Sequence, residues 1–148
     1  MYLAGEALSL TPNMLRFVQL HPYCRFFNHY GPTETHVATV CEFTKRDCEG
    51  PVPIGLPIAN TQSYILTGRQ LTPDGCIGEL YIGGDGLARE YFCRPELTEQ
   101  RFIDNPFKPG LMYKTGDLVR FDSNGQIEFI GRTDDQVKFR GSELNWER

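Results

Sequence analysis

A change of pattern near residue 50 is the feature of this sequence that most constrains its fold. Before it, apolar segments have the lengths of one helix and its flanking strands. After it, short apolar runs are separated by turn-forming groups such as Thr72-Pro73-Asp74-Gly75 and Asn124-Gly125. We therefore expect α/β structure over residues 1–49, followed by a mostly β part over residues 50–133.

The first part predicts a strand, a helix and a second strand. An apolar segment over residues 2–4 is typical of a buried strand, and Phe26-Phe27 of another. Between them, Thr11 suits a helix N-cap and Pro12 the first helical position. The helix should end before Pro22, with an apolar face made of Met14, Leu15, Val18 and Leu20.

Residues 28–34 are predicted to form a loop at the end of the second strand, followed by a strand over residues 37–40. Open α/β sheets bind ligands at the carboxyl ends of their strands. In the second part we expect strands at residues 64–66 and 78–82, a helix of one or two turns at 95–102, and a hairpin of residues 118–121 and 126–130.

Composition excludes several classes of function. The 148 residues carry 15 basic and 19 acidic side chains, without a Lys/Arg run that would bind nucleic acid. No apolar stretch approaches the roughly 18 residues of a membrane span, and no secretory signal is visible. The five cysteines lack metal or redox spacing, so we expect reduced thiols in a cytoplasmic protein; they are Cys24, Cys41, Cys48, Cys76 and Cys93.

The loop at residues 28–35 carries the most chemistry, and its residues alone leave two interpretations open. It combines an aromatic ring, a Gly-Pro turn, hydroxyls and a carboxylate, which suits a base, a phosphate and a metal. An ordinary turn between strands is the simpler interpretation, and composition favours it. The glycine-rich stretch at residues 83–86 does not have the spacing of a dinucleotide-binding fingerprint, because the last glycine of that motif is missing. The three histidines are not spaced as metal ligands.

Three separated segments together resemble the amino-acid-activating (adenylation) domain of nonribosomal peptide synthetases, within the adenylate-forming, or AMP-binding, superfamily. The resemblance covers nearly the whole chain and fits this branch better than acyl-CoA ligases or luciferases. The segments are Asn28-His29-Tyr30-Gly31-Pro32-Thr33-Glu34, Gly78-Glu79-Leu80-Tyr81-Ile82-Gly83-Gly84-Asp85-Gly86-Leu87-Ala88-Arg89, and Tyr113-Lys114-Thr115-Gly116-Asp117-Leu118 followed by Gly131-Arg132-Thr133-Asp134-Asp135-Gln136-Val137-Lys138.

The resemblance implies a fold and an activity. The fold would be the C-terminal part of the large adenylation subdomain: the end of an α/β layer, a small distorted β-barrel, and residues 134–148 as the hinge and truncated start of the C-terminal subdomain. The activity would be attack of an amino-acid carboxylate on ATP with Mg²⁺, giving an aminoacyl adenylate and pyrophosphate. The aminoacyl group would pass to a carrier-protein phosphopantetheine thiol, with condensation domains as further partners.

The resemblance also implies roles for the loop residues. Tyr30 would stack on adenine, and Asn28 would read the adenine amino group. Thr33 would bind the α-phosphate, and Glu34 would ligate Mg²⁺. Thr33 and Glu34, together with Arg132, make up the implied catalytic group.

A second implied group lies in the β part. Asp117 would accept both ribose hydroxyls, and Arg132 would lie near the ribose and phosphate. Phe129 stands where a tyrosine is common near the ribose, so one hydroxyl contact would be absent. Asp134 matches the hinge of the domain. Part of the amino-acid pocket would be lined by Tyr2, Ala4, His29, Val37 and Ala38, which does not identify the amino acid.

Two features that the family needs have no counterpart in these 148 residues: the phosphate loop with its lysine, and a second catalytic lysine. We therefore expect negligible adenylation by this chain alone. Two alternatives stay open at this point. One is a non-catalytic nucleotide-binding remnant, and the other is a piece of a stand-alone acyl or aryl acid ligase.

Overall fold

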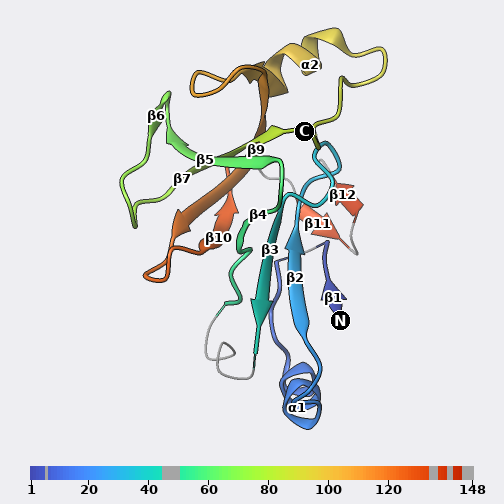
Figure 1. Cartoon of the computed structure of the whole chain (residues 1–148). Helices are drawn as coiled ribbons and strands as arrows, with labels where there is room; N and C mark the ends of the chain where they lie inside the picture. Colours follow the sequence, from blue (N-terminus) through green and yellow to red (C-terminus); the bar gives the residue numbers. More distant parts are fainter. Residues whose placement is uncertain (6, 45–50, 134–136, 140–141, 145–148) are drawn as a thin grey trace.

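The computed structural model describes residues 1–5, 7–44, 51–133, 137–139 and 142–144. Two sheets make up most of it, with α1 at the far end of the first sheet and α2 beside the second (Figure 1). The prediction of α/β structure followed by mostly β structure is confirmed in outline.

The first sheet has four strands in the order β1-β2-β3-β4. Strand β1 runs parallel to β2, with α1 connecting them, which confirms the predicted strand, helix and strand. The later pairs are antiparallel. The elements are β1 (Tyr2–Leu3), α1 (Pro12–Leu20), β2 (Phe26–Tyr30), β3 (Thr39–Phe43) and β4 (Leu56–Pro57).

Helix α1 begins as its sequence predicts. The Thr11 hydroxyl accepts a hydrogen bond from the Met14 N–H at 3.3 Å, and Pro12 occupies the first turn. The predicted apolar face is wrong in part, because Val18 is the only buried residue of the helix and Leu20 is exposed. The expectation of a buried first strand is also wrong, since Tyr2 is 69% exposed at the sheet edge.

Strand β2 is longer than predicted, and this changes the loop after it. Residues 28–30 belong to the strand, where Asn28 and Tyr30 point inward with the period of two that a strand imposes. The Ala38 N–H then donates to the Tyr30 carbonyl at 2.8 Å, so the loop closes at residues 31–38 and β3 starts at Thr39 rather than at residue 37.

The second sheet is antiparallel, in the order β10-β9-β7-β5-β6, with β8 also paired to β9. The predicted hairpin is confirmed, and the Asp122 carboxylate caps its turn by accepting from two backbone N–H groups. A separate pair, β11 (Val137–Phe139) and β12 (Ser142–Leu144), is antiparallel. The other elements are β5 (Thr61–Thr67), β6 (Gln70–Leu71), β7 (Gly78–Gly84), α2 (Pro95–Arg101), β8 (Phe102–Asp104), β9 (Leu111–Phe121) and β10 (Ile127–Arg132).

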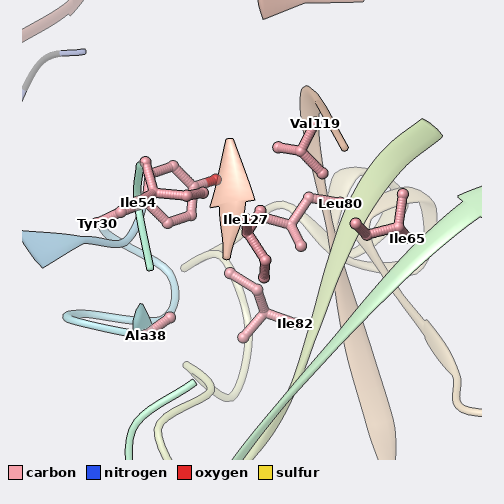
Figure 2. Packing of buried hydrophobic residues seen from close by; sticks show 8 residues of the cluster. All are labelled: Tyr30, Ala38, Ile54, Ile65, Leu80, Ile82, Val119 and Ile127. Carbon is pink, nitrogen blue, oxygen red and sulfur yellow. The ribbon is translucent and has the colours of Figure 1, made fainter. Parts of the chain in front are cut away.

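The main hydrophobic core joins the two sheets (Figure 2). Backbone hydrogen bonds also connect them: the Ile54 N–H donates to the Ile127 carbonyl at 2.8 Å, and the Ile127 N–H donates to the Gly55 carbonyl at 3.1 Å. Side chains of both sheets therefore share one core. The buried members are Tyr30, Ala38, Ile54, Ile65, Leu80, Ile82, Val119 and Ile127.

Two sequence expectations concern features outside this core. The four described cysteines, at positions 24, 41, 76 and 93, are free, and only Cys41 is buried. Within the part of the chain that the structure describes, no helix has the length and apolar character needed to cross a bilayer.

Candidate functional site

Asp117 lies at an irregularity in strand β9. The register between β7 and β9 shifts over this stretch, so that residues 115–117 form a bulge opposite Leu80. Gly116 has a φ of +78°, a conformation that glycine adopts without steric cost. Bulges commonly re-aim side chains at functional sites, and this one turns Asp117 inward until it is 1% exposed.

The polar groups of the bulge all find partners nearby. The Thr115 hydroxyl donates to the Leu80 carbonyl at 2.7 Å and accepts from the Asp117 N–H at 3.0 Å. The Gly116 N–H donates to the Glu79 carboxylate at 3.1 Å, and its carbonyl accepts from Thr133. The bulge is therefore held rigidly, which fixes the orientation of Asp117.

A second irregularity brings Arg132 to Asp117. The register between β10 and β9 shifts between Phe129 and Gly131, after which Arg132 pairs directly with Asp117. Arg132 Nη1 donates to Asp117 Oδ1 at 2.7 Å, and both side chains are largely buried. The guanidinium thus lies where an anionic ligand oxygen near Asp117 would meet a permanent positive charge.

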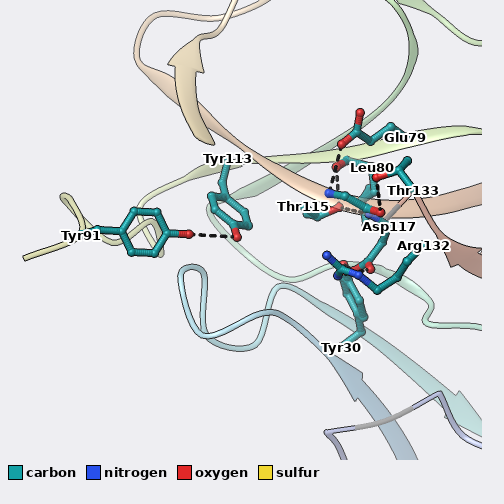
Figure 3. Close-up of polar contacts among 10 residues, drawn as sticks. Tyr30, Glu79, Leu80, Tyr91, Tyr113, Thr115, Asp117, Arg132 and Thr133 are labelled. Carbon is teal, nitrogen blue, oxygen red and sulfur yellow. Dashed lines mark hydrogen bonds and ion pairs between the residues drawn. The ribbon is translucent and has the colours of Figure 1, made fainter. Parts of the chain in front are cut away.

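Tyr30 reaches the same carboxylate from the first sheet. Its hydroxyl donates to Asp117 Oδ2, so that side chains of β2, β9 and β10 meet at one point (Figure 3). Burial raises the pKa of Tyr30 well above its usual range, and the negative charge of Asp117 raises it further. Tyr30 is therefore a neutral hydrogen-bond donor at every physiological pH.

The other residues predicted to contact the nucleotide differ in their burial. The Asn28 amide is buried and donates to the Pro53 carbonyl at 2.8 Å. Phe129 is half-buried and packs against the core cluster. Thr33 is exposed in the loop 31–38.

Glu34 follows Thr33 directly in the same loop. Its Oε1 accepts a hydrogen bond from the Tyr91 hydroxyl, while its Oε2 is buried and has no hydrogen-bond partner among the described residues. Its backbone carbonyl accepts from the Ala88 N–H at 2.7 Å. The loop is therefore attached to the segment that follows β7 by both main chain and side chain.

Sequence reasoning missed two tyrosines here. The Tyr91 hydroxyl lies 3.3 Å from that of Tyr113, which is buried in β9 (Figure 3). Tyr113 opens one of the segments that carry the family resemblance, so its position was a usable signal. Nothing in the sequence connects Tyr91 to Glu34, because 57 residues separate them.

The predicted substrate-pocket residues are only partly brought together. The rings of Tyr2 and His29 lie 4.9 Å apart on neighbouring strands. Ala4 is exposed, Val37 is half-buried, and Ala38 is fully buried in the core cluster. The predicted hinge residue, Asp134, lies outside the described residues.

The described residues include a ligand that suits Mg²⁺. Among the described residues no group of three or more His, Cys, Asp or Glu side chains forms a metal cage. Mg²⁺ does not need one, since it is usually held by one or two carboxylates together with substrate phosphates and water. Glu34 supplies one such carboxylate, and its unpartnered Oε2 is an oxygen that a cation would satisfy.

Comparisons with known proteins identify the family of this chain. A model of the AMP-binding enzyme family matches residues 1–92. The chain is 48% identical over 146 residues to tyrocidine synthase 2 of Brevibacillus parabrevis, covering 95% of this chain and 4% of that protein. It is 54% identical over 125 residues to gramicidin S synthase 1 of Brevibacillus brevis, covering 82% of this chain and 11% of that protein.

Solved structures give the same result. PA1221, an NRPS protein containing adenylation and PCP domains, superimposes with a TM-score of 0.90 at 34% identity, over 97% of this chain and 30% of that one. The artificially fused adenylation-PCP di-domain NpsA-ThdA from Klebsiella oxytoca superimposes with a TM-score of 0.85 at 28% identity, over 97% of this chain and 27% of that one.

The family model matches more than half of the chain, so the chain belongs to the AMP-binding enzyme family. Its resemblance to the adenylation domains of nonribosomal peptide synthetases, inferred from the sequence, is confirmed. The chain spans only a small fraction of these synthetases and less than a third of the solved adenylation proteins.

The buried tyrosines predict a loss of stability in alkali. The pKa values of Tyr91 and Tyr81 are raised from 10.0 to about 12, chiefly by burial. A raised pKa contributes stability that is complete below pH 10 and is lost as the pH passes 12. Urea unfolding followed by circular dichroism at pH 8, 10, 11 and 12 should show this fall, and Tyr91→Phe should flatten it. A free energy of unfolding that stays constant up to pH 12 would contradict the assignment.

Proposed function

We propose that this chain forms the adenosine-binding and magnesium-binding part of a domain that activates an amino acid as its adenylate. In this proposal the amino-acid carboxylate attacks the α-phosphorus of ATP, and pyrophosphate leaves. The aminoacyl group then passes to the phosphopantetheine thiol of a carrier domain, and condensation domains use it. The relatives are peptide synthetases, which favours an amino acid over another carboxylic acid as the substrate.

The observation that carries the proposal is the buried carboxylate of Asp117, held between Tyr30 and Arg132. An ionised carboxylate accepts hydrogen bonds only, and its two oxygens offer about four acceptor positions. Hydroxyl groups donate hydrogen bonds, so both hydroxyls of a ribose are matched to an acceptor of this kind. Arg132 Nη1 places a positive charge 2.7 Å from the Asp117 carboxylate.

In this proposal the remaining residues contact the adenine, the α-phosphate and the ribose. Tyr30 provides the aromatic surface for adenine and Asn28 an amide that discriminates the adenine amino group. Tyr30 is 8% exposed, so stacking requires its ring to become more accessible than it is here. Thr33 contacts the α-phosphate from the exposed loop, and Phe129 covers the ribose side without a hydroxyl contact.

Glu34 holds Mg²⁺ in this proposal, and the cation supplies charge neutralisation at the phosphates. Arg132 would stabilise negative charge on the reacting phosphate, because its guanidinium remains charged at all relevant pH values. Tyr2, Ala4, His29, Val37 and Ala38 belong to the amino-acid side of the site. Asp134 is the hinge in this assignment.

Ribose recognition tests the proposal directly. The full chain should bind AMP more tightly than 2′,3′-dideoxy-AMP by about 10- to 100-fold, because hydrogen bonds to a charged group contribute about 1.5–3 kcal/mol. Isothermal titration calorimetry with both ligands measures this ratio. The variant Asp117→Asn should reduce the ratio several-fold, whereas Asp104→Asn, an exposed aspartate of β8, should leave it unchanged.

The ratio of two affinities does not depend on the fraction of folded protein, so a loss of stability in the Asp117 variant does not mimic the result. Equal binding of AMP and its dideoxy analogue by the unaltered chain would exclude Asp117 as the ribose acceptor. Amino-acid-dependent exchange of pyrophosphate into ATP, in a protein that carries this chain within a complete adenylation domain, tests the activation step.

A further inference from the structure

The carboxylate of Glu34 is held asymmetrically. Tyr91 donates to Oε1, and Oε2 is buried without a hydrogen-bond partner among the described residues. A buried acceptor left in this state is destabilising, because it has lost its hydrogen bonds to water. The bond to Tyr91 therefore fixes which of the two oxygens remains available to a further group.

Tyr91 is itself held in place by several contacts. Its backbone N–H donates to the Thr98 hydroxyl at 3.0 Å, which attaches it to α2. Its ring meets Phe102 edge-on at 5.7 Å, and Phe102 packs against Tyr113 at 5.1 Å. A hydroxyl that is fixed in this way restrains the rotation of the carboxylate that it contacts.

The Tyr113 hydroxyl contacts the Tyr91 hydroxyl. The single proton of the Tyr91 hydroxyl is committed to Glu34, so Tyr113 donates to Tyr91 across 3.3 Å. A tyrosine hydroxyl keeps its proton at neutral pH. The chain of donors therefore runs from Tyr113 through Tyr91 to Glu34.

We propose that Tyr91, supported by Tyr113, is a positioning residue that orients Glu34 as a ligand for the divalent cation of a bound nucleotide. This inference rests on the proposed function and adds two residues to it. Carboxylates that bind metal ions are themselves hydrogen-bonded, and loss of such an outer partner typically costs 10- to 100-fold in metal affinity. Tyr91 has no other evident reason to meet a half-buried glutamate so far away in the sequence.

The test is the magnesium dependence of ATP binding to the full chain. ATP affinity is measured by calorimetry over a series of Mg²⁺ concentrations for the unaltered chain and for Tyr91→Phe. We expect the Mg²⁺ concentration that produces half of the increase in ATP affinity to be about 10-fold or more higher in the variant. The affinity for ATP without Mg²⁺ should not change. Complexation of ATP with Mg²⁺ in solution is identical in both measurements and cancels in the comparison.

A matched control is available in the same sheet. The Tyr81 hydroxyl donates to the Glu79 carboxylate at 3.2 Å, and its pKa is also raised to about 12. Tyr81→Phe removes the same kind of bond elsewhere and should leave the Mg²⁺ dependence unaltered. Tyr113→Phe should shift it in the same direction as Tyr91→Phe, by a smaller factor.

The outcomes separate this inference from the proposed function. If Glu34→Gln abolishes the Mg²⁺ effect but Tyr91→Phe behaves like the unaltered chain, the positioning role is wrong and the function stands. A Tyr91→Phe variant that lowers ATP affinity equally with and without Mg²⁺ reveals a structural role only, and also overturns the inference. If the unaltered chain shows no Mg²⁺-dependent ATP binding, both fail together.

Discussion

Replacing Asp117 by alanine should lower the free energy of unfolding by about 3–5 kcal/mol, the range measured when one partner of a buried ion pair is removed. The variant leaves the Arg132 guanidinium, which is 11% exposed, without the carboxylate that neutralises it. It also removes the hydrogen bond that the buried Tyr30 hydroxyl donates to Asp117. Urea unfolding at pH 7, followed by circular dichroism, measures the change.

A double substitution shows whether the uncompensated charge is the cause. Removing both charges with Asp117→Ala and Arg132→Leu together should recover part of the stability lost in the single variant, because well-packed apolar replacements of buried ion pairs are often tolerated. Asp104→Ala, at an exposed position of the same sheet, should change the free energy of unfolding by less than about 0.5 kcal/mol. A single Asp117 variant as stable as the parent chain would show that this ion pair does not contribute to the stability of the fold.

Replacing Gly31 by alanine should be as damaging, for a purely steric reason. A Cβ atom at this position would lie 1.6 Å from the backbone oxygen of His36, a distance at which the loop 31–38 cannot keep its shape. Core overpacking costs about 1–3 kcal/mol and sometimes more. We expect the upper end of that range, because the obstruction is main chain rather than a movable side chain. The same urea unfolding experiment measures it.

Gly131 is the matched control for this substitution. A Cβ atom there would meet no heavy atom within 4 Å, and its φ lies outside the left-handed region. Gly131→Ala should therefore change stability by less than about 1 kcal/mol in either direction. Gly31→Ala should also weaken AMP binding, because the loop carries Thr33 and Glu34. Retention of full stability and AMP affinity by Gly31→Ala would exclude the close contact with His36.

The elements of this fold were largely predictable because their signals are local. Thr11 and Pro12 mark the start of α1, and Ser123-Asn124-Gly125 marks the turn between β9 and β10. The extent of β2 was not predictable. Asn28 and His29 are poor strand formers by propensity, and Tyr30 stays in the strand because of a hydrogen bond from Ala38, whose position depends on the folded loop.

The family resemblance named Tyr30, Asp117 and Arg132 as candidate site residues but did not predict their arrangement. The hydrogen bonds that Asp117 makes with Tyr30 and Arg132 depend on two strand irregularities that no sequence pattern predicts. The hydrogen bond between Tyr91 and Glu34 was not predictable from the sequence either. It arises from tertiary packing between segments that are far apart along the chain.

The hydrogen bonds that run between Ile54, Gly55 and Ile127 join the two sheets through the main chain alone. Bonds of this kind use no side-chain atoms, so most side chains of these strands can change without removing them. Gly55 is the exception, because its φ is +86° and a Cβ atom there would lie 2.0 Å from the Val40 carbonyl oxygen. Sequences can therefore diverge in this region while the spacing of the two sheets is inherited. The close superposition with PA1221 at 34% identity is what such inheritance would produce.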